Sequence, residues 1–357
     1  MTGIHDNTET RAGRVLDDTE AAELTRWLAG RLPGAGEVGI VPLAQAAGHS
    51  HEIHLVTRGD RRWVLRVAPD HPEAAVGGAF DLSREARILA ALSGTGIAHP
   101  AVVLARDDTT PLRRDLLVTE FVDGITLDRA LPPQFANARD GRAITESIVD
   151  TLARINTLDW AATGLAALTR PDGYLGRQFD KARVMLEQFR TRDTPALDTL
   201  LGRLEARQPR EYRLGLIHGD YSAMNLMVDR AEPAVCAVLD WETATVGDAM
   251  VDIGYLTARW VRPDENPMVA AFALGGTDPR AHDLVPGRRH LVDRFAERTG
   301  WSVDLLPFYQ GLAMARLAVV LEGRVATSKR RRRDDAATMF TALADGCADH
   351  GLRLADG

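Results

Sequence analysis

The sequence predicts an α+β protein with two lobes: a small N-terminal lobe with an antiparallel sheet and one helix, and a larger, mostly helical C-terminal lobe. Three observations support this fold class. Two short apolar runs flank a turn at residues 58–61, which is typical of a β-hairpin. A helical segment over 81–92 is followed by an apolar strand at 115–122. From about residue 141 onward, the apolar residues largely keep a helical period.

The N-terminal lobe begins with a predicted amphipathic helix over residues 17–32. Leu24 and Leu28 keep helical spacing, and Asp17 with Glu20 has the pattern of a capping box. The period then changes to that of extended chain. The sequence therefore predicts a helix that leads into a sheet.

The strands of the predicted sheet are residues 52–57 and 62–67, joined by Arg-Gly-Asp-Arg, and residues 115–122. Between them, residues 81–92 return to a helical pattern. The pair Asp-Gly ending at Gly124 then breaks the last strand, because such pairs favour turns.

The C-terminal lobe contains one region that is not helical. Short apolar runs at 214–217, 226–228 and 234–239 alternate with polar turns, which predicts a loop and a hairpin set into the helices. The join between the lobes is expected near Gly124. The predicted domains are a nucleotide-binding lobe over 1–123 and a lobe over 124–357 with the catalytic loop and the acceptor site.

The composition excludes several classes of partner. The 357 residues are 45% hydrophobic and 26% charged with a formal charge of −7, so no global basic field would attract nucleic acid. Cys236 and Cys347 lie far apart and do not have metal-ligand spacing. No signal-peptide pattern opens the chain and no run is long enough to span a membrane. We expect a cytoplasmic protein without nucleic-acid or membrane partners; the sequence does not indicate its oligomeric state.

The strongest functional signal is His218-Gly219-Asp220, followed by Asn225 and by Asp240 at the end of an apolar run. Phosphoryl transfer needs a carboxylate that orients the attacking hydroxyl, and oxygen ligands for magnesium. A base and an amide five residues apart fit the two ends of one loop. A carboxylate after the next hairpin strand can face the same metal.

These residues resemble the aminoglycoside phosphotransferase and choline kinase group of the protein-kinase-like superfamily. The group's H-G-D-x-x-x-x-N motif reads HGDYSAMN here, and its D-W/F-E segment reads LDWE. The following VGDAMVDIGYL is similar to the group's G-D-P-x-x-D-L stretch, with Ala249 in place of proline. Within the group, four segments resemble the phosphotransferase-like domains fused to some acyl-CoA dehydrogenases: GHSHEIHLVT, WVLRV, EFVDG and the later FAERTGWSVDLLPFYQGLAMARLAVVLEG.

The resemblance implies a two-lobed kinase fold and roles for five residues. Asp220 would be the catalytic base, with His218 beside it in the catalytic loop. Asn225 and Asp240 would hold one or two Mg²⁺ ions, and Asp252 would brace the loop through backbone hydrogen bonds.

In this fold, a strand residue contacts the α- and β-phosphates and pairs with a glutamate on the following helix. Those positions fall on Arg66, where the broader family carries lysine, and on Glu85. Val64 shares a strand face with Arg66 and could cover the adenine ring. An arginine can still hold phosphate, in bidentate fashion.

Two further segments match nucleotide-binding positions. Gly48 and Ser50 lie where a phosphate-covering turn is expected, although a plain hairpin turn explains them nearly as well. Glu120 and Val122 lie in the segment that resembles the hinge, where main-chain groups would meet the adenine edge. The expected cofactors are ATP, with GTP as an alternative, and Mg²⁺.

Three other patterns favour ordinary structure. Residues 34–39 spell G-x-G-x-x-G but follow a helix instead of a strand, so we expect a loop. His49, His51 and His54 suggest a metal site, but 51 and 54 point to opposite faces of a strand and solvated histidines are favoured. The basic run 329–333 is expected to be a solvated helix surface, ahead of an anion-binding rim or a nucleic-acid patch.

The acceptor is expected to be a hydroxylated small molecule bound by the helical lobe, around 170–200 and 255–330. A polycationic aminoglycoside would favour a carboxylate-lined cleft, which Arg259-Trp260-Val261-Arg262 and the run 329–333 do not resemble. A neutral or anionic metabolite, such as a hydroxyacyl-CoA, fits better. The alternatives are a degenerate kinase that binds nucleotide and acts as a regulatory protein, and an interaction protein with a basic patch.

Overall fold

The computed structural model describes residues 16–43, 51–68, 81–107, 109–170 and 172–356. These residues form two compact units that are not continuous in sequence. The first lies within residues 1–86 and 101–121, and the second within 87–100 and 122–357. The segment 87–100 therefore belongs with the helical unit, although it comes before the last strands of the sheet-containing unit.

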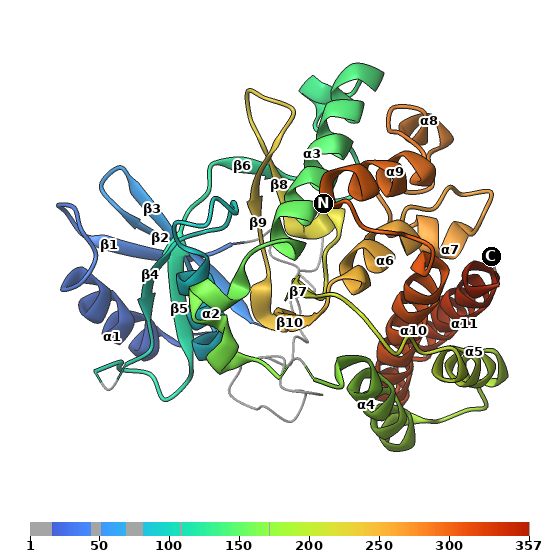
Figure 1. Cartoon of the computed structure of the whole chain (residues 1–357). Helices are drawn as coiled ribbons and strands as arrows, with labels where there is room; N and C mark the ends of the chain where they lie inside the picture. Colours follow the sequence, from blue (N-terminus) through green and yellow to red (C-terminus); the bar gives the residue numbers. More distant parts are fainter. Residues whose placement is uncertain (1–15, 44–50, 69–80, 108, 171, 357) are drawn as a thin grey trace, which may run out of the picture. The chain divides into compact units, whose positions relative to one another are not determined.

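The first unit is built on a five-stranded antiparallel sheet with the order β1-β2-β3-β5-β4 (Figure 1). Its strands are β1 (Val38–Pro42), β2 (Glu52–Arg58), β3 (Arg61–Val67), β4 (Val102–Ala105) and β5 (Leu116–Glu120). β2 and β3 form the predicted hairpin, and β5 is the predicted strand at 115–122. β1 was not expected: the loop predicted over 34–39 ends at Glu37, because Val38 and Gly39 pair with β2.

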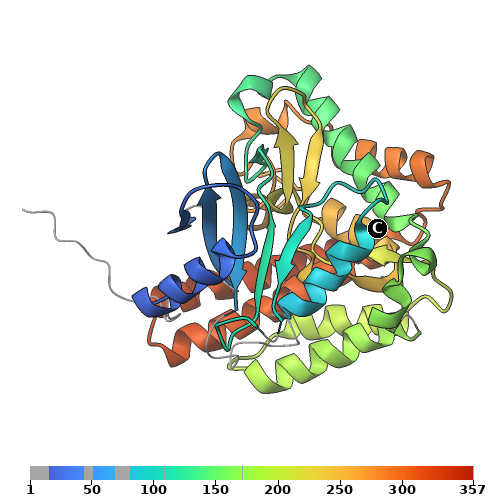
Figure 2. The same ribbon diagram turned by 90° about the vertical axis from the view of Figure 1, so that its left-hand side faces the viewer.

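One face of this sheet packs on helix α1 (Asp18–Ala29) and forms the core of the unit. Asp17 caps the helix and Glu20 bonds back to the Asp17 backbone, which confirms the predicted capping box. Leu24 and Leu28 are fully buried against strand residues such as Leu65. Figure 2 shows α1, in dark blue, beside the strands of the sheet.

Helix α2 (Leu82–Leu92) follows the hairpin and carries Glu85 in its first turn. The backbone N–H of Arg84 donates to the Asp81 carboxylate at 2.7 Å, so Asp81 satisfies a free amide at the start of the helix. The predicted helix over 81–92 is confirmed.

The second unit contains two small sheets in addition to its helices. The first pairs β6 (Gly124–Thr126), β8 (Leu226–Asp229) and β9 (Val235–Val238) in the order β6-β8-β9. The other pairs β7 (Leu214–Ile217) with β10 (Thr245–Asp248). These strands confirm the hairpin and loop predicted between residues 214 and 239.

The remaining chain of the second unit is mostly helical, as predicted. Its α-helices are α3 (Ala138–Asn156), α4 (Tyr174–Phe189), α5 (Pro195–Ala206), α6 (Met250–Ala258), α7 (Pro267–Ala270), α8 (Pro279–His282), α9 (Arg288–Thr299), α10 (Leu306–Arg330) and α11 (Asp334–Ala355). Single 3₁₀ turns lie at η2 (Pro133–Phe135), η3 (Trp160–Thr163), η4 (Leu165–Leu168), η5 (Ala223–Asn225) and η6 (Trp241–Thr243). α6 and α10 are largely buried and pack together.

Two further observations concern the basic run 329–333 and the length of the helices. Lys329 to Arg333, at the end of α10, are exposed, which confirms the predicted solvated surface. Among the described residues, no helix is long and apolar enough to cross a membrane.

Candidate active site

The loop with the HGD motif leaves β7 at Ile217 and ends at η5. β7 pairs with β10 in antiparallel register, with Ile217 opposite Thr245. The segment His218 to Asn225 therefore begins where β10 starts. Tyr221 anchors the middle of the loop: it is fully buried and its hydroxyl donates to the carbonyl of Ile148 at 2.8 Å.

The His218 side chain is a structural part of this loop. It is fully buried, its Nε2 lies 2.8 Å from the Leu239 carbonyl, and its Nδ1 accepts from the Asp220 amide at 3.3 Å. Because the carbonyl can only accept and the amide can only donate, the contacts fit a neutral ring with its proton on Nε2. The Trp241 ring packs edge-on at 4.9 Å. Both His218 ring nitrogens are therefore used in contacts with backbone groups.

Asp252 holds the start of the loop from helix α6. Its Oδ2 accepts from the His218 amide at 2.7 Å and its Oδ1 from the Gly219 amide at 2.8 Å. Asn156 donates to the same carboxylate at 3.3 Å. Burial outweighs these hydrogen bonds and raises the pKa of Asp252 above its ordinary value. The contacts are the backbone hydrogen bonds expected for Asp252.

Gly219 has a left-handed backbone with φ of 84°. A Cβ at this position would lie 2.8 Å from Thr243 Oγ1 and 3.0 Å from the Thr243 carbonyl. Thr243 in turn donates to the carbonyl of His218 at 2.7 Å. A glycine is needed here both for its φ angle and for the close approach of η6.

The Asp220 carboxylate is the exposed end of the loop, with 40% of its side chain accessible. Asn225 Nδ2 donates to Asp220 Oδ2 at 3.1 Å and to the Asp220 carbonyl at 2.9 Å. Burial, and then the nearby Asp220 carboxylate, raise the pKa of Tyr255 above its ordinary value. Arg259 Nη1 lies 4.0 Å from Asp220 Oδ1 and donates to the Tyr255 oxygen at 3.0 Å. The carboxylate is thus fixed from the loop and from α6.

Strand pairing brings Asn225 and Asp240 together. Asn225 immediately precedes β8, and Asp240 lies two residues after β9, which is antiparallel to β8. Leu226 is opposite Val238, and the Leu239 amide donates to the Asn225 carbonyl at 2.8 Å. The two side chains therefore start from neighbouring backbone positions, as the motif predicts.

The donor set fits a magnesium ion. Because the Asn225 amide nitrogen is used by Asp220, its oxygen is the atom left to act as a ligand. Asp240 supplies carboxylate oxygens from a left-handed backbone with φ of 63°. Mg²⁺ prefers oxygen ligands and is held by one or two carboxylates with water and substrate phosphates. In the part of the chain that the structure describes, no cluster of three or more His, Cys, Asp or Glu offers another metal site.

The sequence did not predict the contact of Arg316 with this loop. Arg316, on α10, donates from Nη2 to the Gly219 carbonyl at 3.4 Å. Its Nη1 is buried without a hydrogen-bond partner among the described residues. Arg316 lies in the stretch 295–323 that resembles the phosphotransferase-like domains, but nothing in that stretch indicates a contact with a loop far away in sequence.

The first unit contains the predicted Arg66–Glu85 ion pair, with 2.6 Å between Nη1 and Oε1. Glu85 is 2% exposed, so the pair is well shielded from water. Val64 is half-buried and lies two residues from Arg66 on β3, on the same face. The structure thus brings together the strand and helix residues predicted for the phosphates.

The histidines differ from expectation. His51 and His54 are 9% and 4% exposed, so the prediction of solvated histidines is wrong for both. His51 Nδ1 lies 3.0 Å from Arg66 Nη2, and His54 Nε2 lies 3.5 Å from a Glu52 carboxylate oxygen. Both rings are buried beside a charged side chain, Arg66 for His51 and Glu52 for His54. His49 lies outside the described residues.

The other nucleotide-binding candidates are main-chain positions. Glu120 ends β5, and its amide donates to the Ala101 carbonyl at 2.9 Å. The Val122 carbonyl accepts from the Gly124 amide at 3.1 Å. Gly48 and Ser50 lie outside the described residues.

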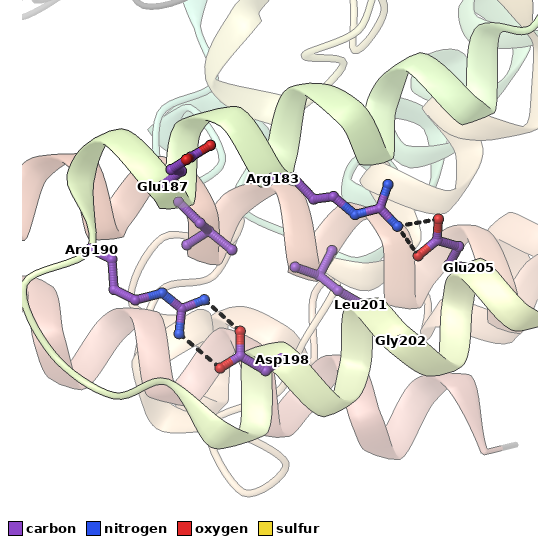
Figure 3. Close-up of a pocket in the computed structure, with 8 residues that line it drawn as sticks. Arg183, Glu187, Arg190, Asp198, Leu201, Gly202 and Glu205 are labelled. Atoms are coloured by element: carbon purple, nitrogen blue, oxygen red, sulfur yellow. Dashed lines mark hydrogen bonds and ion pairs between the residues drawn. The ribbon is translucent and has the colours of Figure 1, made fainter.

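A groove between α4 and α5 does not include the HGD loop (Figure 3). It has a volume of about 500 Å³, and two ion pairs line it, Arg190 with Asp198 and Arg183 with Glu205. A smaller cavity of about 290 Å³ is lined by residues from Ala130 to Ala136 and from Leu274 to Val285. Neither holds the chemistry-bearing residues.

A comparison with protein families decides the affiliation. Residues 43–285 match the model of the phosphotransferase enzyme family, and this stretch includes both the ion pair and the HGD loop. The chain belongs to this phosphotransferase family.

Relatives of this phosphotransferase include much longer proteins. The chain is 28% identical over 310 residues to acyl-CoA dehydrogenase family member 10 of Mus musculus, and the match covers 84% of this chain and 28% of that protein. It is 26% identical over 330 residues to family member 11 of Homo sapiens, covering 90% and 41%. The chain therefore spans less than half of these relatives. An aminoglycoside 3′-phosphotransferase of Streptomyces fradiae is 31% identical over 239 residues, covering 61% of this chain and 83% of that one.

Solved structures establish the fold. A putative aminoglycoside phosphotransferase from Ralstonia eutropha superposes with a TM-score of 0.75 at 26% identity, covering 94% of this chain and 98% of that one. A choline kinase from Cryptosporidium parvum superposes with a TM-score of 0.63 at 13% identity, covering 95% and 96%. The chain has the protein-kinase-like α+β fold of these enzymes, as the sequence predicts.

Proposed function

We propose that this phosphotransferase is an ATP-dependent kinase that transfers the γ-phosphate to a hydroxyl group of a small molecule, with Asp220 as the catalytic base. One observation carries the proposal. Asp220 is the accessible carboxylate of a loop whose backbone is fixed by Asp252, and Asn225 donates to one of its carboxylate oxygens. A carboxylate held in this way can accept the hydroxyl proton as the oxygen attacks the γ-phosphorus.

Asn225 and Asp240 would hold Mg²⁺, which neutralises charge on the nucleotide phosphates when bound. The chain's own contribution is to bring an amide oxygen and a carboxylate to one place through the β8–β9 pairing. His218 contributes indirectly, because its buried ring links the Asp220 amide to the chain just before Asp240.

Arg66 would contact the α- and β-phosphates, with Glu85 as its buried counter-ion. Val64 is proposed to cover the adenine ring, and the main chain at Glu120 and Val122 to meet its edge. Gly48 and Ser50 are proposed to cover the phosphates. GTP remains the alternative nucleotide.

The acceptor is proposed to be neutral or anionic rather than polycationic. Arg259 and Arg316 bring positive charge to the surroundings of Asp220. This charge would repel an aminoglycoside and attract a carboxylate, a phosphate or a phosphorylated carrier. A hydroxyacyl-CoA satisfies this requirement, and the relatives named as acyl-CoA dehydrogenases are consistent with it.

The first test is a calorimetric titration of ATP, with and without Mg²⁺, into the wild type and Asp240→Ala. We expect magnesium-dependent binding that is weakened at least about tenfold in the variant, because it lacks one of the few charged ligands. A screen of hydroxylated acceptors follows, with a hydroxyacyl-CoA and an aminoglycoside compared directly. Phosphorylation of the aminoglycoside alone would refute the acceptor class.

If the wild type bound neither ATP nor GTP, the proposed kinase function would be refuted. ATP binding with no transfer to any acceptor, and no difference between wild type and Asp220→Asn in slow ATP hydrolysis, would instead favour a degenerate kinase that acts by binding nucleotide.

A further inference from the structure

Arg66 is held at both ends of its guanidinium group. Nη1 lies 2.6 Å from Glu85 Oε1, and Nη2 lies 3.0 Å from His51 Nδ1. Both partners are buried, Glu85 at 2% and His51 at 9% exposure. The arginine is therefore fixed by one anion and by one imidazole.

The chemistry of the second contact determines the state of His51. A guanidinium has five N–H donors and no acceptor, so the facing Nδ1 must accept the hydrogen bond. The ring is then neutral at this contact, with its proton on Nε2. A hydrogen bond between an ionised donor and a neutral acceptor is stronger than one between two neutral groups.

Strand register brings these side chains to one face. Ile53 is directly opposite Arg66 in the β2–β3 pairing, so His51, two residues earlier, is the diagonal neighbour of Arg66. His54 is opposite Leu65 and belongs to the other face. Two histidines three residues apart thus have different environments, and only one of them contacts the arginine.

We propose that His51 is a positioning residue for the nucleotide, because it fixes the Arg66 guanidinium in the orientation in which it meets the phosphates. This inference depends on the proposed nucleotide-binding function of Arg66. It also explains what arginine does at a position where the family usually has lysine. A planar fork can be fixed by two partners at once, whereas an ammonium is a single point on a flexible stem.

The test compares binding of two probes, Mg²⁺-ATP and adenosine, to the wild type and to His51→Phe. Phenylalanine keeps the ring and removes the acceptor. We expect affinity for ATP to fall about tenfold, since hydrogen bonds to charged groups contribute on the order of one decade in an equilibrium constant. Affinity for adenosine should not change, because adenosine has no phosphate for Arg66 to hold.

Three further variants separate positioning from simple stability. His51→Asn keeps an acceptor close to the place of Nδ1 and should restore ATP affinity. His51→Gln puts its amide beyond that place and should resemble His51→Phe, so the pair remains informative if the phenylalanine variant does not fold. The matched control is His54→Phe, on β2 and on the opposite face from His51, which should bind ATP like the wild type.

A double-mutant cycle completes the test. In an Arg66→Lys background, His51→Phe should have little further effect on ATP affinity, because the group through which His51 acts is gone. Unchanged ATP affinity in His51→Phe, or an equal loss for ATP and adenosine, would overturn the inference while leaving the kinase proposal intact. Failure of the wild type to bind any nucleotide would overturn both.

Discussion

In the helical unit, Asp252 organises the candidate catalytic loop by accepting two backbone N–H groups, whereas in the first unit Glu85 organises the phosphate-binding candidates by accepting from one side chain, Arg66. Both carboxylates are buried. The Asp252 contacts are to backbone amides, which every residue except proline has. They therefore depend on the path of the chain through the loop, and that path is set by the HGD motif. Side-chain partners can be exchanged, and here the arginine is also contacted by a histidine, His51.

The largest expected effect is the loss of catalytic rate on substituting Asp220, the accessible carboxylate of the loop that Asp252 holds. Asp220→Asn keeps the shape of the side chain but cannot accept a proton. We expect kcat to fall about 1000-fold, within the range for loss of a general base, while ATP affinity stays near that of the wild type. Steady-state rates and calorimetry measure the two quantities. A similar loss of ATP affinity would show that the loop and the phosphate-binding residues are not separable.

A smaller effect, on stability, is expected from Asp252→Ala. The substitution leaves the amides of His218 and Gly219 buried without their acceptor. At about 2 kcal/mol for each buried donor, the free energy of unfolding should fall by about 4 kcal/mol. Chemical denaturation measures this change, and Asp252→Asn, which retains one acceptor, should lose less. If both variants unfold like the wild type, the brace is not what holds the loop.

The smallest effect concerns Asp248, a carboxylate at the end of β10 that braces no loop. Burial raises its pKa from 3.8 to about 6, although Tyr309 donates to it at 2.5 Å. The folded state then binds a proton at pH 5 that the unfolded state does not bind. This group should therefore make the protein about 1 kcal/mol more stable at pH 5 than at pH 7.

To isolate the contribution of Asp248, the free energy of unfolding is measured at pH 5 and pH 7 for the wild type and for Asp248→Asn. Asparagine does not titrate, so the contribution of about 1 kcal/mol should be absent from its pH dependence. Equal pH dependence in both proteins would show that Asp248 keeps an ordinary pKa.

Much of the fold could be predicted from local patterns. The hairpin of β2 and β3, the capping box at Asp17 and the β8–β9 hairpin are all short-range features, so a window of a few residues contains the signal. The HGD loop is similar, because Asp220, Asn225 and Asp240 come from a single stretch of chain.

What could not be predicted comes from contacts between distant residues. Arg316 reaches the Gly219 carbonyl from 97 residues away, and the family-like stretch around it does not indicate this contact. The burial of His51 depends on strand register and on a partner 15 residues away, so polarity alone suggested solvent. The grouping of residues 87–100 with the helical unit likewise follows from packing and leaves no mark in composition.

The left-handed backbone of Asp240 means that folding and chemistry favour different residues at this position. With φ at 63°, glycine would adopt the same conformation with less steric conflict. A search for thermostable variants that scores folding alone would therefore be drawn to residue 240 and would discard a carboxylate proposed to hold the metal. Stability engineering of this protein should keep Asp240 fixed and look for its gains elsewhere in the chain.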